Sequence, residues 1–355
     1  MDALAERPFL LYAALLLVTI LLPSARSRAL AGAGLLLTAL GIAADRVGGA
    51  DAGSAFAITN EILGGAGALI VIFAAFRAWR ERAAPDAPVP RPPRLIRDPL
   101  LPAGLLLAAF GPQLILVAAG TFLGLLFAAA TAMRTGHTRW TALAAIGAVL
   151  LGAGFFLQFT ILGPLGGRMS ELSAGPFSPP AERLLVILLG FGALLLSGLF
   201  PFHRAPWRLA LAPVAAILLV RVLVPALAEG LRDWQAPAML WLTVAVAFAA
   251  FQGRWSAATA GGGLLGMWSG NREAVELGLV LVSFAWLADA GFLPPPLRSG
   301  AGNERWSGLW FAVPAAAIPF VLSGALQAQV LVSVLAVAVA VTGLVLESHR
   351  RADAG

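Results

Sequence analysis

The sequence predicts an all-α membrane protein, a polytopic bundle of about 12 or 13 transmembrane helices in a single domain over residues 1–355. Of the 355 residues, 59% are hydrophobic and 12% are charged, and the mean hydropathy is +0.87. Soluble domains carry about 25% charged residues. The apolar residues fall in runs of about 17 to 25, which suits helices that cross a bilayer. Inside lipid the backbone must satisfy its own hydrogen bonds, so these runs are predicted to be helices.

The helices expected from these runs follow one another with short polar connections. Their predicted ranges are 8–25, 29–44, 56–76, 99–111, 112–133, 139–163, 182–200, 209–229, 235–252, 257–270, 274–293, 308–325 and 328–346. The first three helices (1–76) are separated from the rest by an Arg/Pro-rich linker, 77–98, which is expected in the cytoplasm. The linker is either a solvated loop or a contact with acidic headgroups or a partner subunit.

The distribution of arginine predicts the topology. All of the basic residues are Arg, and alternate connections, with the helix ends beside them, divide all of these except Arg221 into a rich set and a poor set. The rich set is Arg26, Arg28, Arg77, Arg80, Arg82, Arg91, Arg94, Arg97, Arg134, Arg139, Arg204, Arg208, Arg254, Arg298, Arg305, Arg350 and Arg351. The poor set is Arg7, Arg46, Arg168, Arg183, Arg232 and Arg272. Because cytoplasmic loops carry the excess of basic residues, we expect the N-terminus outside and the C-terminus in the cytoplasm.

Missing residue types exclude several chemistries. The chain has no Cys and three His, so disulfides, thiolate metal sites, iron–sulfur clusters and paired haem ligands are not expected. We therefore predict no cofactor and no metal. The net charge of +6 comes from Arg in loops on one side of the membrane, so the lipid bilayer and not nucleic acid is the expected partner.

The segment Leu194–Trp207 is the most informative for function. An apolar helix is followed by Pro201, which has no backbone donor and disturbs the preceding turn. Carbonyl groups near Leu196 and Ser197 are then expected to lose their helical partners. Such a break in a membrane survives where protein or water satisfies it, as in ion pathways. An ordinary helix end at the interface is the other interpretation.

Two motifs in this part of the chain resemble a known family. Phe200-Pro201-Phe202-His203, then Trp207 and Ala212-Pro213-Val214, is similar to the "PFH–W … aPv" segment of the antiporter-like, proton-translocating membrane subunits. This family occurs in respiratory complex I, membrane-bound hydrogenases and Mrp-type antiporters. Leu114–Met133, with Gly120–Leu126, resembles the family's "LFLGLELLSL" helix. The resemblance covers roughly residues 100–250.

The resemblance implies inverted repeats, each with a broken helix. They would be a first repeat at 99–229, broken near Ser197 and Pro201, and a degenerate second repeat at 235–346. It also implies a bacterial inner membrane and other membrane subunits as partners. The family's channel Glu falls at Leu126 and its Lys at or near Leu196. Leucine cannot exchange a proton, so these are read as degenerate channel positions.

Four polar residues are the candidates for any remaining ion pathway: Arg221, His203, Glu276 and Gln158. Arg221 is predicted near the bilayer centre, where a charge costs roughly 2.5–3.5 kcal/mol and needs a partner or water. It is either a fixed charge in the relic of the ion path or a structural Arg that bonds helix carbonyls or Glu229. For Gln158, a hydrogen bond between helices is the default interpretation.

Three functions remain open. The first is a divergent antiporter-like subunit of a complex I-like or related ion-translocating complex, a structural and non-catalytic chain with a degenerate proton channel. The second is an active proton- or cation-conducting subunit that uses substitute residues. The third is an unrelated multi-pass transporter or a lipid-processing membrane enzyme.

Overall fold

The computed structural model describes the central part of the chain. The described residues are 100–111, 113–136, 138–163, 177–202, 211–252, 254–270 and 272–289, together with 31, 34, 35, 71, 72, 75, 204 and 207. The predicted helices 8–25, 308–325 and 328–346, most of 29–44 and 56–76, and the linker 77–98 lie outside the described residues. The chain divides into two units, residues 1–130 and 131–355, and we treat each unit by itself.

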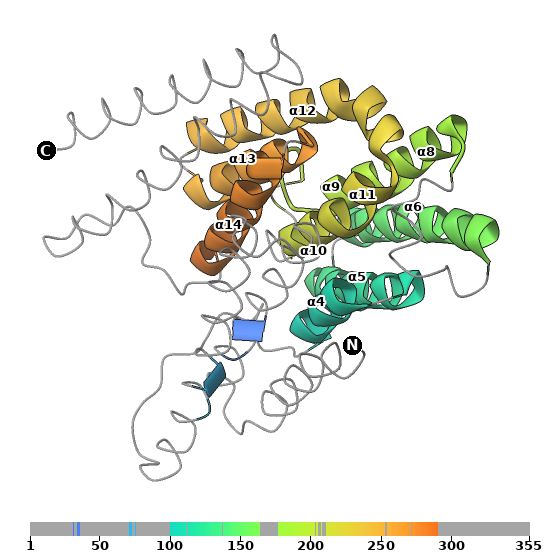
Figure 1. Ribbon diagram of the computed structural model, residues 1–355. Helices are drawn as coiled ribbons and strands as arrows, with labels where there is room; N and C mark the ends of the chain where they lie inside the picture. Colours follow the sequence, from blue (N-terminus) through green and yellow to red (C-terminus); the bar gives the residue numbers. More distant parts are fainter. Residues whose placement is uncertain are drawn as a thin grey trace, which may run out of the picture. The chain divides into compact units, whose positions relative to one another are not determined.

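The described residues form helices and turns, and no β-strand occurs among them, so the all-α prediction is confirmed for this part of the chain (Figure 1). Three helices are long and apolar enough to cross a membrane: Leu114–Arg134, Thr138–Leu162 and Pro179–Leu196. At a rise of about 1.5 Å per residue, the shortest of these spans roughly 27 Å, close to the thickness of a hydrocarbon core.

Two helices, α4 (Leu100–Phe110) and α5 (Leu114–Thr135), begin in the first unit and meet through small residues. A Cβ atom on Gly120 would lie 2.3 Å from the carbonyl oxygen of Gly104 and 2.4 Å from the backbone nitrogen of Ala108. No larger residue fits at this crossing. Small residues at such spacing let helix backbones approach closely in membrane proteins.

In the second unit, α6 (Thr138–Leu162) runs antiparallel to a helix made of three consecutive parts. These parts are α8 (Pro179–Leu185), the π-helical segment η2 (Val186–Phe191) and α9 (Gly192–Leu196). A Cβ atom on Gly147 would lie 2.6 Å from the Leu196 side chain, and one on Gly154 would lie 2.6 Å from the Leu189 side chain. Later residues of α6 therefore contact earlier residues of the second helix, which shows that the two helices are antiparallel.

The next helix also contains a π-helical segment. It comprises α10 (Ala212–Leu218), η4 (Leu219–Leu223) and α11 (Val224–Ala226). Every residue of α10 and η4 is buried. The apolar composition of this stretch matches its position in the interior of the unit.

Three helices complete the described part of this unit: α12 (Ala228–Phe251), α13 (Trp255–Trp268) and α14 (Arg272–Asp289). In the described residues α13 packs against both α12 and α14 (Figure 1). Between α13 and α14, a Cβ atom on Gly278 would lie 2.4 Å from the Gly263 carbonyl oxygen. This crossing repeats the small-residue packing of α4 and α5.

Two helix boundaries differ from the prediction for clear physical reasons. The predicted helix 182–200 ends at Leu196, because Gly198 takes a φ of +74°, the left-handed conformation that commonly stops a helix. Pro201 therefore follows the end of the helix and does not cause it. The predicted helix 235–252 begins earlier, at Ala228. Its first turns contain the charged residues Glu229, Arg232 and Asp233, whose side chains are exposed and are therefore compatible with a helix.

Candidate functional site

The candidate site is the end of α9 and the turn that follows it, Leu194–Phe202. The last turn of a helix leaves carbonyl groups without intrahelical partners. Here the carbonyl oxygen of Leu194 accepts from the backbone nitrogen of Ser197 at 3.2 Å and from its hydroxyl at 2.6 Å. The carbonyl of Leu199 accepts from the nitrogen of Phe202 at 2.6 Å. Ser197 is fully buried, so this helix end lies in the protein interior.

Two tryptophan side chains satisfy further carbonyls of this turn. The Nε1 of Trp207, a fully buried residue, donates to the carbonyl oxygen of Leu196 at 2.9 Å. The Nε1 of Trp241, on α12, donates to the carbonyl oxygen of Phe200 at 2.7 Å. The sequence predicted that carbonyls near Leu196 and Ser197 lose their helical partners and are satisfied by protein or by water. For the Leu196 carbonyl the donor is a protein side chain, the Trp207 indole.

An aromatic cluster links this turn to the π-helical segment η2. The ring of Phe191 lies 5.8 Å from Trp234, 5.9 Å from Trp241 and 5.8 Å from Trp268, measured between centroids. Such pairs contribute about 0.5–1.5 kcal/mol beyond the area they bury. The cluster therefore holds the cap residue Trp241 and the helix interior of η2 in one packed group.

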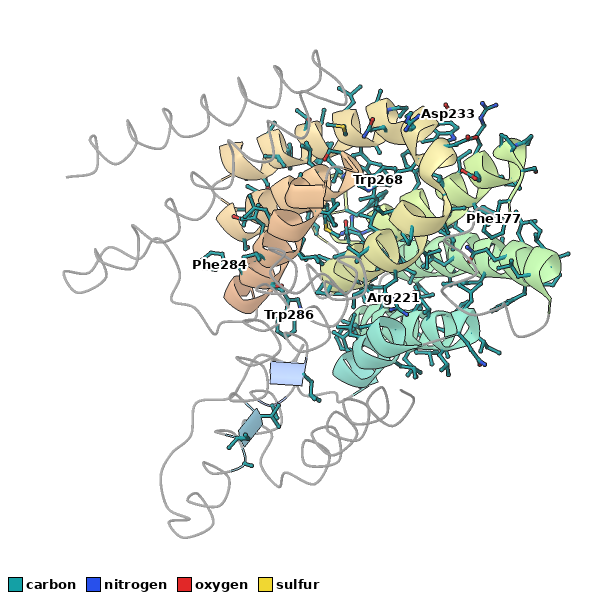
Figure 2. The ribbon with its side chains drawn as sticks, in the orientation of Figure 1. Phe177, Arg221, Asp233, Trp268, Phe284 and Trp286 are labelled. Carbon is teal, nitrogen blue, oxygen red and sulfur yellow. The ribbon has the colours of Figure 1, made fainter. Side chains whose placement is uncertain are left out.

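The two π-helical segments approach each other through a glycine. A Cβ atom on Gly190 would lie 2.9 Å from the Leu223 side chain and 2.8 Å from the Trp268 ring. Arg221 lies in η4 and is 5% exposed (Figure 2). Single π-turns occur frequently at functional sites in proteins. The sequence predicted a charge inside a helix at Arg221, and Arg221 is buried in a helix. The sequence did not predict the π-helical backbone around it.

Gln158 is the other described member of the predicted ion pathway. It is fully buried on α6, and neither its amide nitrogen nor its amide oxygen has a hydrogen-bond partner. The hydrogen bond between helices that the sequence favoured is thus not formed. Gln235 on α12 shows the contrasting case, because its Nε2 donates to the carbonyl oxygens of Trp268 at 3.0 Å and Ser269 at 2.7 Å.

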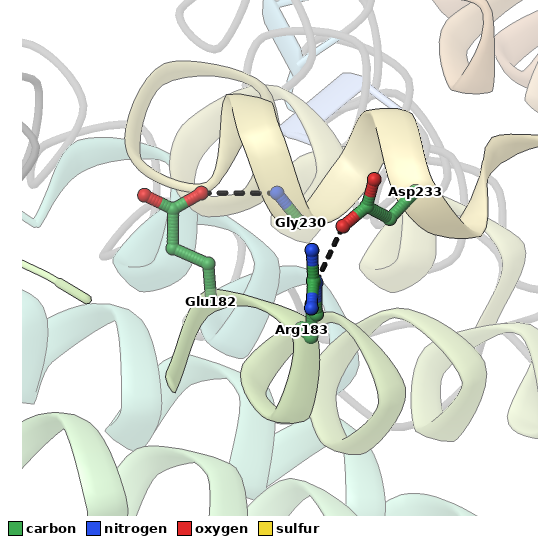
Figure 3. A network of polar contacts seen from close by, with 4 residues as sticks. All are labelled: Glu182, Arg183, Gly230 and Asp233. Carbon is green, nitrogen blue, oxygen red and sulfur yellow. Dashed lines mark hydrogen bonds and ion pairs between the residues drawn. The ribbon is translucent and has the colours of Figure 1, made fainter. Parts of the chain in front are cut away.

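A small polar network joins the starts of α8 and α12 (Figure 3). The buried carboxylate of Glu182 accepts from the backbone nitrogen of Gly230 at 3.0 Å. Arg183 Nε and Asp233 Oδ2 form an ion pair at 2.5 Å, with both side chains about half exposed. An exposed pair contributes only about 0–1 kcal/mol. The Glu182 bond is the part of the network that fixes the two helix starts.

The remaining predicted site residues divide into three groups. Leu196 is buried, 3% exposed, at the end of α9, whereas Leu126 is 60% exposed on α5. Pro201 is exposed in the turn after the helix end. His203 and the side chain of Glu276 lie outside the described residues. Among the described residues, no group of three His, Asp or Glu side chains could hold a metal ion.

Sequence analysis missed the capping role of Trp207 and Trp241 and the two π-helical segments. Trp207 belongs to the motif that the sequence singled out, but no local pattern shows which carbonyl its indole reaches. Gly198 was a visible signal for the helix end, since a Gly after an apolar helix commonly marks its C-terminus. The π-helical segments leave no clear signal, because only the hydrogen-bond register distinguishes them from an α-helix.

The described residues define a helical protein with three helices able to span a membrane, whose interior helix end is capped by side chains. Comparisons with family models, with curated proteins and with solved structures found no match for the chain.

Proposed function

We propose that this chain is a divergent antiporter-like membrane subunit of a respiratory complex I-like or related ion-translocating complex, with a structural role and a degenerate proton channel. In this proposal the full chain is a polytopic bundle in a bacterial inner membrane, with the N-terminus outside. Sister membrane subunits and lipid surround it, and redox chemistry belongs to other chains. We infer this family from the resemblance of its motif to Phe200–His203, Trp207 and Ala212–Val214.

One observation supports the structural role most directly. Leu196 lies buried at an interior helix end, at the position where the resemblance implies a Lys. A leucine cannot accept or release a proton. Among the described residues, the buried titratable side chains are Glu182 and Arg221. Glu182 accepts from a backbone amide at the start of α12, at the opposite end of α8–α9 from Leu196. Arg keeps its proton under ordinary conditions, so Arg221 is not suited to relay protons.

The buried position of Arg221 favours a second candidate function, an active cation- or proton-conducting subunit. A fixed positive charge in a π-helical segment could organise water along a path, as charges in membrane interiors often do. The two candidates differ in what Arg221 does for ion flux.

Ion flux in reconstituted vesicles distinguishes the two candidates. The purified assembly is reconstituted with Arg221 intact or with Arg221→Leu, and proton and sodium movement are followed with dyes. For a structural subunit we expect the flux per assembly to remain within about twofold, because no exchangeable proton is removed. An Arg183→Leu variant controls for loss of an exposed Arg. A tenfold or larger loss confined to Arg221→Leu would favour conduction.

A further inference from the structure

Three backbone carbonyls at the end of α9 and in the turn after it accept hydrogen bonds from side chains of this chain. Leu194 is bonded by Ser197, Leu196 by the Trp207 indole and Phe200 by the Trp241 indole. Ser197 and Trp207 are fully buried. These three carbonyls therefore have protein donors in a buried part of the structure.

Carbonyl groups at the C-terminus of a helix carry partial negative charge. In membrane transporters, such freed carbonyls at half-helix ends coordinate sodium ions or protons. An indole N–H is a donor only, and its ring is large and apolar. Trp207 can therefore satisfy the Leu196 carbonyl and at the same time occupy the space that a hydrated cation would need.

Trp207 is itself held by a neighbouring ring. The Trp140 and Trp207 rings meet edge to face with centroids 6.4 Å apart, and the guanidinium of Arg139 lies 4.7 Å from the Trp140 centroid. The indole that bonds Leu196 is thus positioned from α6 as well as from its own turn.

We propose that Trp207, supported by Trp241, closes the end of α9 to water and to monovalent cations, and that Trp207 is the residue that sets this closure. The inference rests on the proposed function only for the membrane setting of the helix end. The inference adds a second reason why ions do not pass the end of α9. Besides the replacement of titratable residues by leucine, the Trp207 side chain closes this helix end.

The absence of Cys from the chain allows a direct test of access to this helix end. Leu199, 2% exposed between the two capped carbonyls, is replaced by Cys as a reporter. The rate at which a thiol reagent carrying a trimethylammonium group modifies Leu199→Cys is measured in membranes. Three backgrounds are compared: the otherwise unchanged chain, Trp207→Phe and Trp140→Phe. Both Phe variants keep an aromatic ring, but only Trp207→Phe removes the donor to Leu196.

We expect slow modification in the unchanged and Trp140→Phe backgrounds and a rate roughly five- to hundredfold higher with Trp207→Phe. This is the range that corresponds to the loss of one buried hydrogen bond. Equal rates in Trp207→Phe and Trp140→Phe, or rapid modification in the unchanged background, would overturn the inference. If Leu199→Cys does not insert in the membrane, Ala193→Cys, a buried position in α9, serves as the reporter with the same outcomes.

The test separates this inference from the proposed function. Rapid labelling in the unchanged background would disprove the closure. It would not bear on whether the chain assembles with partner subunits, which is tested by identifying the proteins that purify with it. A sealed helix end in a chain without partner subunits would support the closure and count against the proposed function.

Discussion

Two buried glutamines of the second unit differ in what their amide groups contact. Gln158 has no hydrogen-bond partner, whereas Gln235 bonds the carbonyls of Trp268 and Ser269 at the end of α13. An unsatisfied buried polar group costs about 1–3 kcal/mol, and a satisfied one stabilises the fold. The same residue type therefore has opposite effects at the two positions.

This difference gives a paired prediction. Gln158→Met should raise the free energy of unfolding by about 1–2 kcal/mol, because it removes an unsatisfied amide and keeps the side-chain volume. Gln235→Met should lower it by about 1–3 kcal/mol, because it leaves two carbonyls without their donor. Thermal unfolding in detergent checks both variants. A loss of stability in Gln158→Met equal to that in Gln235→Met would show that Gln158 has a partner, such as bound water.

At the residue scale, the sequence predicted burial better than bonding. It placed Arg221 and Gln158 in helix interiors, and both are buried. It could not predict the Trp207–Leu196 bond, because that contact joins residues 11 positions apart in the sequence. Leu126, which the resemblance pairs with Leu196 as a channel position, is exposed on α5, and its role stays a prediction.

At the scale of elements, glycine positions fix how closely helices pack. Gly263 and Gly278 face each other between α13 and α14, and a Cβ on either would meet the other's carbonyl oxygen at 2.6 Å or less. Gly262, the neighbour of Gly263 in sequence, has open space where its Cβ would lie. The two adjacent positions on one helix therefore have different tolerance to a methyl group.

The contrast predicts the effects of two alanine substitutions. Gly278→Ala should destabilise the protein by about 1–3 kcal/mol, since α13 and α14 must separate to admit the methyl group. Gly262→Ala should be neutral or stabilising by up to about 1 kcal/mol, because Ala has the higher helix propensity. The midpoint of thermal unfolding in detergent measures both. Equal midpoints for the two variants would contradict the close crossing.

Element boundaries show what a sequence pattern can and cannot predict. The predicted helices 99–111, 112–133 and 139–163 agree closely with α4, α5 and α6, because long apolar runs between polar turns leave little ambiguity. The start of α12 was predicted seven residues late, since charged residues at its first turns looked like a loop. The π-helical segments were not predicted, because only the hydrogen-bond register distinguishes them from an α-helix.

At the scale of the whole molecule, four arginines of the second unit lie in pairs at two ends of its helices. Arg139 precedes Trp140, whose ring meets Trp207, and Arg204 lies three residues before Trp207. Arg183 and Arg232 lie at the starts of α8 and α12, which meet through Glu182 and Gly230. Since α6 and α8–α9 run antiparallel, these are opposite ends of the helices. The sequence had assigned the same pairs to opposite sides of the membrane.

The composition of the assembly is the most direct test of the proposed function. The full chain is extracted from its native membrane in a mild detergent and purified through a C-terminal tag, and its partners are identified by mass spectrometry. We expect membrane subunits of the antiporter-like type, together with soluble iron–sulfur or flavin subunits, in a fixed ratio to this chain. A chain that purifies alone under conditions that keep other membrane complexes intact would contradict the account.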